Sequence, residues 1–294
     1  MLNHLGKYLF QVLAETLMRA NNRYGITIPW YIMTSKENND DTIAFLEKKE
    51  YFGYPKNHVT IFKQEEVPLL DYKGRLLMGE DMLIKKAANG NGGVFNSMLK
   101  KGVIADMESK KIEWVFIGAV DNVLLKLVDL PLIGLCIKNG TEIATKTVLK
   151  KSPEEKVGIF CRQNGKVKII EYTELPEEAA IRVDEHGELI FGESNILSNL
   201  FSIKAVKKAS TKELCYHVAH KAESFIDENG NLVKPDQPNC YKFEKFIFDA
   251  FNLFDNISIL RGVREKDFAP IKNSKGPDSP ETAKILYDNY WGNH

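Results

Sequence analysis

The sequence predicts an α/β fold in which a mixed, mostly parallel sheet carries an antiparallel β insertion at about residues 142–202. Three observations predict this class. Helix-like and strand-like segments alternate up to Asp129, which is the order of a layered parallel sheet. The run 113–120 is mostly apolar, as expected of a parallel strand covered on both faces. Beyond residue 142, a hairpin signal and further strand-like pieces indicate antiparallel pairing.

Length and charge limit the classes of function. The 294 residues can bury a sizeable core, and we expect a single domain over residues 1–294. Lys plus Arg and Asp plus Glu both number 40, so no net field favours nucleic acid or an anionic membrane. No apolar run reaches spanning length, and Glu15 marks the first helix pattern as part of the fold rather than a targeting segment. Neither nucleic acid nor a membrane is therefore an expected partner.

The cysteines and histidines predict neither disulfides nor a zinc site. Four widely spaced cysteines form no C-x-x-C pair, which favours reduced, inert thiols in a cytoplasmic protein. His217 and His220 could share one face of a predicted helix at 210–222. No nearby cysteine or second acidic residue completes a zinc set with them.

The first half of the chain alternates between helices and strands. Apolar residues at helical spacing predict an amphipathic first helix, and Gln64 follows the second predicted strand at its carboxyl end. In order, the predicted elements are a helix from Leu5 to Leu17, a strand at 26–33, a helix at 42–50, a strand at 59–62, a turn at 71–75, a short strand at 76–78 and a helix at 94–99.

A cluster of glycine and asparagine, residues 89–93, precedes the helix predicted at 94–99. Glycines let backbone amides approach a ligand closely, and the start of a helix favours anions. The spacing matches neither G-x-G-x-x-G nor a Walker loop, so dinucleotide and P-loop chemistry are not supported. By itself, such a cluster is more often an ordinary turn.

The buried strand at 113–120 ends in Asp121 and Asn122. In open α/β sheets, ligands bind outside the carboxyl ends of the strands, so Asp121 would meet a ligand or a metal ion there. The alternative is that Asp121 caps a helix at 123–128, because Asp and Asn are frequent caps. Pro131 is expected to prevent that helix from continuing.

The second half of the chain begins with strand signals. Residues 157–162 and 167–172 flank Asn164-Gly165, a clear hairpin signal. The remaining predictions are strand-like pieces at 188–191 and 196–201, the helix at 210–222, a turn at Asn229-Gly230, an apolar helix at 243–254 and a strand at 257–263.

Several short peptides are informative when they are taken together and in their order along the chain. They are P-W-Y-I-M-T-S at 29–35, Y-F-G at 51–53, I-F-K-Q at 61–64, G-N-G-G at 90–93, V-D-N at 120–122, Y-H-V-A-H-K at 216–221 and F-A-P-I-K-N at 268–273. Together they resemble the UDP-N-acetylhexosamine pyrophosphorylase branch of the eukaryotic-type UDP-sugar pyrophosphorylase family. The resemblance covers nearly the whole chain, and the order of the set, rather than any single motif, makes it specific.

The resemblance implies a Rossmann-like sheet of the nucleotide-diphospho-sugar transferase type. It also implies transfer of a uridylyl group from UTP to an N-acetylhexosamine 1-phosphate, giving UDP-N-acetylhexosamine and pyrophosphate, with Mg²⁺ as cofactor. UTP or a UDP-sugar, and a sugar 1-phosphate, would be the partners. N-acetylglucosamine is the favoured sugar, while N-acetylgalactosamine and glucose stay open.

The resemblance also implies roles for nine residues. Gln64 and the backbone at Gly90 would hold the uracil, and Asn91 would contact ribose or sugar hydroxyls. Asp121 would help to hold Mg²⁺ or the ribose beside it, and Lys272 would approach the phosphates as a point charge. The sugar pocket would be lined by Gly158, Glu171, Tyr172 and Asn195.

One family feature has no counterpart in these 294 residues: a first strand followed by a G-x-G-T-R type loop that cradles the triphosphate. We therefore expect a truncated catalytic domain that is weakly active or inactive alone, with a complementing N-terminal polypeptide as a further partner. The alternatives are a fragment of a split enzyme and a non-catalytic UDP-sugar-binding module. A glycosyltransferase is a third class, but the ordered motifs and the lack of a D-x-D pair at Asp121 argue against it.

Overall fold

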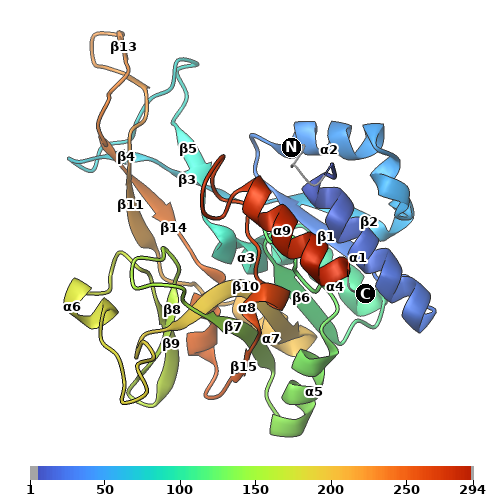
Figure 1. Ribbon diagram of the computed structural model, residues 1–294. Coiled ribbons are helices and arrows are strands. Elements are labelled where there is room, and N and C mark those ends of the chain that lie inside the picture. The colour runs from blue at the N-terminus through green and yellow to red at the C-terminus, as the bar shows by residue number, and fades with distance from the viewer. Residues whose placement is uncertain (1–5, 293–294) are drawn as a thin grey trace.

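The predicted amino-terminal helix and first two strands are present, with shifted ends, in the computed structural model, which describes residues 6–292 (Figure 1). Helix α1, Leu9–Tyr24, buries one apolar face, and Leu5 lies outside the described residues. Strand β1, Trp30–Thr34, starts directly after Pro29 and pairs in parallel with β2, Val59–Lys63. Helix α2, Asn39–Lys48, makes the crossover between them.

The largest sheet has six strands in the order β15-β7-β10-β8-β9, with β6 also paired to β10. Strand β10 is antiparallel to β6, β7 and β8, while β7 is parallel to β15. These strands are β6 (Trp114–Gly118), β7 (Ile143–Leu149), β8 (Ile159–Gln163), β9 (Lys166–Ile170), β10 (Glu193–Ser202) and β15 (Ser258–Arg261).

The mixed α/β class is confirmed, but its antiparallel part is central rather than inserted. Strands β7 and β10 come from the predicted antiparallel region and occupy the middle of the largest sheet. In the part of the chain that is described, only β1–β2 and β7–β15 pair in parallel. A mostly parallel, Rossmann-like sheet therefore stays a prediction. The hairpin is confirmed, since β8 and β9 pair across Asn164 and Gly165, whose φ angles are 53° and 78°.

The helices cover this sheet and join it to the β1–β2 pair. Helices α3 and α7 pack together over a core that includes Phe95, Phe201 and Phe251. Helix α9 packs on α1, where the guanidinium of Arg19 lies 3.9 Å from the ring centroid of Trp291. The remaining helices are α3 (Val94–Lys100), α4 (Val103–Ser109), α5 (Leu130–Asn139), α6 (Glu177–Ala180), α7 (Ile203–Ser210), α8 (Arg264–Asp267) and α9 (Pro280–Trp291).

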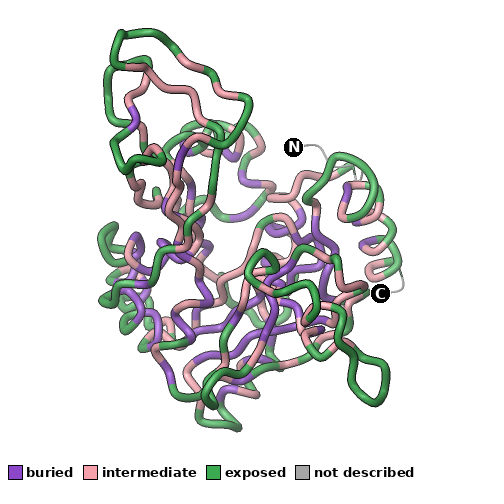
Figure 2. Tube along the Cα trace, turned by 90° about the vertical axis from the view of Figure 1, so that its left-hand side faces the viewer, coloured by how far each residue is buried: buried purple, intermediate pink, exposed green. Residues whose placement is uncertain are grey.

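A narrow β arm rises from the body, and much of its surface is exposed (Figures 1 and 2). Its small core contains Leu69, Leu77 and Cys240. The arm comprises β3 (Glu66–Pro68), β4 (Leu70–Asp71), β5 (Lys86–Ala88), β11 (His217–Lys221), β12 (Phe225–Ile226), β13 (Leu232–Val233) and β14 (Cys240–Glu244).

The prediction of a helix at 123–128 is wrong. After β6 the chain runs through turns, and α5 begins only at Leu130, with Pro131 in its first turn. Proline fits a first helical turn because its missing N–H has no partner there. Pro131 therefore begins a helix instead of ending one, and Asp121 caps no helix at 123–128.

Three further predictions fail in the second half. Helix α7 ends at Ser210, and His217 and His220 lie on strand β11, where residues three apart point to opposite faces. The apolar run 243–254 divides into the end of β14 and a 3₁₀ helix, Ile247–Leu253. Residues 188–191 form no strand, only a bridge between Val183 and Leu189.

All four cysteines are free, as predicted. Within residues 6–292 we find no helix with the length and apolar character needed to cross a membrane.

Candidate functional site

The Gly/Asn loop, residues 89–93, is held against the chain that follows β14. A Cβ atom at Gly90 would lie 2.4 Å from the carbonyl oxygen of Lys245, and the φ angle of Gly90 is 82°, so only glycine fits. The side-chain oxygen of Asn91 accepts a hydrogen bond from the Ile247 N–H at 2.8 Å. This leaves the amide nitrogen of Asn91 as the group able to donate to a ligand.

Gln64 lies beside this loop. Its backbone N–H donates to the Thr34 carbonyl at 2.8 Å, which places it at the carboxyl end of both β1 and β2. The next residue, Glu65, accepts a hydrogen bond from the Asn89 N–H at 3.2 Å. The fold thus brings together the three residues with an implied uridine role, Gln64, Gly90 and Asn91.

Asp121 and Lys272 belong to two loops that are tied together by Asn122. The Asn122 side chain is 1% exposed; it donates to the carbonyl of Asp267 at 2.8 Å and accepts from the Ala269 N–H at 2.9 Å. The Ile271 N–H donates to the Asp121 carbonyl at 3.0 Å. Asn122 therefore positions the loop that carries Lys272 next to Asp121.

The charge of Lys272 acts on Asp121. Burial raises the pKa of the Asp121 carboxyl above its ordinary value, the positive charge of Lys272 opposes that rise, and the negative charge of Asp278 adds to it. Two carboxylates and one ammonium thus lie within electrostatic range of one another outside the end of β6. Such a set has spare negative charge for a cation and a positive group for a phosphate.

Three of the four implied sugar-pocket residues are in contact. The Asn195 N–H donates to the Gly158 carbonyl at 2.8 Å, and a Cβ atom at Gly158 would lie 3.1 Å from the carboxylate of Glu171. Tyr172, the next residue after Glu171, is 42% exposed. Burial, then the negative charge of Glu174, raises the pKa of Glu171, while His217 and Lys272 lower it. Lys272 thus acts electrostatically on both Asp121 and Glu171.

A histidine–carboxylate group that was not predicted from the sequence lies between Phe246 and Glu174. The Nε2 atom of His217 lies 3.0 Å from a carboxylate oxygen of Asp249, and its Nδ1 atom lies 3.6 Å from Glu174. The His217 ring lies 4.8 Å, centroid to centroid, from that of Phe246, the residue before Ile247. Burial raises the pKa of Asp249, and the charge of His217 opposes it. A signal was present, because Asp249 is the only charged residue within 246–254 and a buried acid needs a partner.

Comparison with known proteins decides the family. A family model described as UTP–glucose-1-phosphate uridylyltransferase matches residues 4–277. The chain belongs to this uridylyltransferase family. The resemblance read from the ordered motifs is therefore confirmed.

Relatives within the uridylyltransferase family include two curated proteins. UDP-N-acetylhexosamine pyrophosphorylase-like protein 1 of Xenopus tropicalis is 36% identical over 297 residues, covering 97% of this chain and 58% of that protein. UDP-N-acetylglucosamine pyrophosphorylase of Saccharomyces cerevisiae is 35% identical over 293 residues, covering 96% of this chain and 61% of that protein. The chain thus spans less than two thirds of the length of these relatives.

A solved structure from the same family agrees with the fold. The uridine diphosphate N-acetylglucosamine pyrophosphorylase from Trypanosoma brucei, in complex with an inhibitor, gives a TM-score of 0.81 at 30% identity. The match covers 95% of this chain and 58% of that chain.

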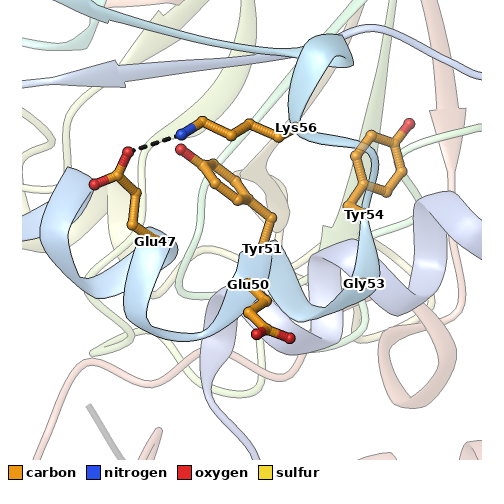
Figure 3. Close-up of a pocket in the computed structure, with 6 residues that line it drawn as sticks. All are labelled: Glu47, Glu50, Tyr51, Gly53, Tyr54 and Lys56. Atoms are coloured by element: carbon orange, nitrogen blue, oxygen red, sulfur yellow. Dashed lines mark hydrogen bonds and ion pairs between the residues drawn. The ribbon is translucent and has the colours of Figure 1, made fainter.

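A surface hollow of about 640 Å³ lies apart from these residues (Figure 3). Its lining includes Tyr51, Glu47 and Lys56, the last two joined by an ion pair of 2.9 Å, and none of the residues with an implied role. Tyr51 and Phe52 have φ angles of 52° and 54°, a left-handed conformation that is costly for bulky residues. The Y-F-G peptide therefore forms a strained turn, which is a structural role and not a binding role.

The described residues contain no group of three or more His, Cys, Asp or Glu side chains arranged to hold a metal ion. A magnesium ion commonly takes only one or two carboxylates and completes its shell with water and substrate phosphates. Asp121 and the nearby Asp278 could supply such a partial site.

Proposed function

We propose that this chain is the larger part of a uridylyltransferase that converts UTP and an N-acetylhexosamine 1-phosphate into UDP-N-acetylhexosamine and pyrophosphate. The observation that carries the proposal is a continuous set of contacts from Gln64, through the 89–93 loop and His217, to Glu171 and Asn195. Segments far apart in the sequence thereby line one path suited to an elongated nucleotide sugar. The names of the family model and of the curated relatives support the same reaction.

The nucleotide end of the ligand is assigned to the 64 and 89–93 segments. Gln64 and the backbone at Gly90 bind the uracil, since a base edge needs paired donors and acceptors, and Asn91 binds ribose or sugar hydroxyls. Gly158, Glu171, Tyr172 and Asn195 line the sugar pocket. A side chain at Gly158 would crowd that carboxylate, because its Cβ atom would lie only 3.1 Å from a Glu171 carboxylate oxygen.

The phosphates are assigned to Asp121 and Lys272. When bound, Mg²⁺ would be held by Asp121 and would neutralise charge on the phosphate oxygens. Lys272 supplies a point charge from the adjoining loop, and Asn122 keeps the two loops in place. Uridylyl transfer makes a bond from a sugar phosphate oxygen to the α-phosphorus of UTP and releases pyrophosphate. Positioning and charge neutralisation therefore carry most of the catalysis.

N-acetylglucosamine 1-phosphate is the sugar substrate we propose, in line with the name of the yeast relative. The described residues act as one catalytic domain, and a complementing polypeptide supplies the loop that cradles the triphosphate. The alternative is a non-catalytic module that binds UDP-sugars with the same residues.

Calorimetry combined with a pyrophosphate-release assay tests the proposal. The purified chain should bind UTP, UDP and UDP-N-acetylglucosamine, and the assay should show pyrophosphate release from UTP and N-acetylglucosamine 1-phosphate once a complementing segment is added. Binding of the nucleotide sugar without turnover under any condition would favour the non-catalytic module. Absence of all uridine-nucleotide binding would refute both.

A further inference from the structure

The side chain of His217 lies between two acidic residues on segments that are far apart in the sequence. It projects from strand β11, and 24% of its side-chain surface is exposed. Its Nε2 atom lies 3.0 Å from a carboxylate oxygen of Asp249, in the 3₁₀ helix Ile247–Leu253. Its Nδ1 atom lies 3.6 Å from a carboxylate oxygen of Glu174. Each ring nitrogen therefore faces one carboxylate.

The contact with Asp249 leads to the Gly/Asn loop. The Asp249 oxygen that faces His217 also accepts a hydrogen bond from the Phe246 N–H at 3.3 Å, which caps the start of the 3₁₀ helix. The next N–H, that of Ile247, donates to the side-chain oxygen of Asn91 at 2.8 Å. The direction of the backbone group that orients the Asn91 amide therefore depends on where Asp249 is held.

The contact with Glu174 leads to a tight turn over residues 171–174. The Glu171 N–H donates to one side-chain oxygen of Glu174 at 3.2 Å, and the Glu174 N–H donates to the Glu171 carbonyl at 2.9 Å. The other side-chain oxygen of Glu174 is the one that faces His217. The same carboxylate thus closes the turn that carries Glu171 and connects this turn to strand β11.

Aromatic packing restricts the imidazole between these two contacts. Its ring centroid lies 4.8 Å from that of Phe246 and 6.0 Å from that of Phe248. The two phenylalanine rings are stacked on each other, with centroids 5.0 Å apart and an interplanar angle of 19°. A ring packed against such neighbours has few rotamers open to it, so the two nitrogens of His217 point in defined directions.

Three carboxylates around His217 act on one another. Burial, followed by the negative charges of Glu174 and Asp249, raises the pKa of Glu171, and His217 opposes this rise. Burial also raises the pKa of Asp249; His217 opposes this rise, and Glu174 adds to it. The carboxylates therefore repel one another, and His217 is a shared partner that relieves the repulsion.

We propose that His217 is a positioning residue that holds the Gly/Asn loop and the 171–174 turn in one arrangement. Through one ring nitrogen it orients the amide of Asn91, and through the other it orients the carboxylate of Glu171. The nucleotide role of Asn91 and the sugar role of Glu171 rest on the proposed function. The arrangement of the two segments does not, because it can be measured without a ligand.

Two amide variants separate the two contacts. Glutamine places its side-chain nitrogen close to the position of Nε2 in histidine, and asparagine places its nitrogen close to the position of Nδ1. His217→Gln should therefore keep the bond to Asp249 and lose the contact with Glu174, while His217→Asn should do the reverse. His220→Ala is the matched control, because His220 is an exposed histidine of the same strand and points to the opposite face.

Hydrogen exchange of backbone amides measures the arrangement in the protein without ligand. The amides of Phe246 and Glu171 each donate to a carboxylate that His217 contacts. In His217→Asn, the Phe246 amide should exchange about tenfold faster than in the unmodified protein, and the Glu171 amide should be unchanged. His217→Gln should show the opposite pattern, and His220→Ala should change neither amide.

Calorimetry with UDP and UDP-N-acetylglucosamine connects the arrangement to binding. His217→Asn should raise the Kd for UDP about tenfold. His217→Gln should leave the Kd for UDP unchanged and raise the Kd for UDP-N-acetylglucosamine about tenfold. His220→Ala should leave both Kd values unchanged.

Three results would overturn the proposal. They are unchanged exchange in both amide variants, faster exchange of both amides in each variant, and unchanged Kd values in variants whose exchange has changed. Because each variant tests one contact, the result from either one alone is sufficient. Absence of all uridine-nucleotide binding by the unmodified protein would refute the proposed function, while the exchange rates would still decide whether His217 holds the two segments.

Discussion

At the scale of single residues, the pair Asp121 and Lys272 gives a prediction with a defined sign. Burial has raised the pKa of Asp121, and Lys272 opposes that rise. Replacing Lys272 with alanine should therefore raise the pKa further. A protonated carboxyl does not bind Mg²⁺, so magnesium-dependent binding of UTP should be lost at a higher pH in Lys272→Ala than in the unmodified protein.

Calorimetric titrations with UTP and Mg²⁺ across a pH series would measure this midpoint. Lys275→Ala removes an exposed lysine of the same loop and serves as the charge-matched control. Asp121→Ala should abolish the magnesium dependence while leaving the fold intact. An unchanged pH midpoint in Lys272→Ala would show that the charge of Lys272 does not influence metal binding by Asp121.

Gln64 gives a second prediction at this scale. Gln64→Ala removes an amide proposed to pair with the uracil edge, which should cost about 0.5–1.5 kcal/mol, or at most roughly tenfold in the Kd for UDP. Titrations with UDP would measure it, with Gln163→Ala, an exposed glutamine of the β8–β9 hairpin, as control. Equal affinities of the two variants for UDP would show that Gln64 does not bind the uracil.

The position of a candidate residue could be predicted from the sequence where it lies at a strand end or in a short motif, and not where it depends on a tertiary contact. Gln64 and Asp121 follow strands that were correctly placed, and the structure brings each beside its expected neighbours. The contact of His217 with Asp249 joins residues 32 apart and could not be read from spacing. The sequence predicts Asp249 within an apolar helix at 243–254, and that prediction gives no reason to expect a contact with His217.

At the scale of elements, buried ion pairs join the loop after β6, strand β7 and helix α8. The Lys146 ammonium contacts Asp129 and lies 2.9 Å from a carboxylate oxygen of Asp267, which Lys126 also approaches at 2.9 Å. Although burial alone would raise the pKa of Asp267, hydrogen bonds from Lys126 and Lys146 hold it below its ordinary value. These bonds anchor the segment whose carbonyl binds Asn122, and so support the Asp121 loop.

Asp267→Asn should therefore destabilise the protein by about 3–5 kcal/mol, because two lysines lose their shared carboxylate in a buried site. Urea unfolding at pH 7 would measure the loss, with the exposed Asp255→Asn as control. The lowered pKa of Asp267 also determines how its contribution to stability depends on pH. The contribution of Asp267 is present above about pH 3.9, its unfolded value, and is lost as the pH falls through the lower folded value. A variant whose unfolding is unchanged at pH 7 would contradict this account.

Elements were predicted reliably where apolar periodicity and flanking residues agreed, as for α1 and the β8–β9 hairpin. Apolar runs alone did not separate helix from strand, and the run 243–254 shows why. The N–H of Lys245 donates to the Asn89 carbonyl, and its carbonyl accepts from Gly92. These bonds to a loop more than 150 positions earlier keep the chain extended there, against its helical pattern.

At the scale of the whole molecule, the sequence predicts a mostly parallel sheet, whereas the described residues contain two parallel strand pairs, β1–β2 and β7–β15. Strand β10 pairs antiparallel with β6, β7 and β8, so most of the pairings in the largest sheet are antiparallel. These pairings join strands that are far apart in the sequence, and the alternation of helices and strands along the chain could not predict them.

Activity of the whole molecule should depend on the groups that neutralise the triphosphate. Lys272 is the one positive group that we assign to the phosphates, and charge neutralisation carries most of uridylyl transfer. The chain alone should therefore release pyrophosphate from UTP and N-acetylglucosamine 1-phosphate weakly or not at all. A continuous pyrophosphate assay should show turnover only when a complementing segment is added, and Asp121→Ala with the same segment is the control that should stay inactive. Steady turnover by the unmodified chain alone would contradict the prediction.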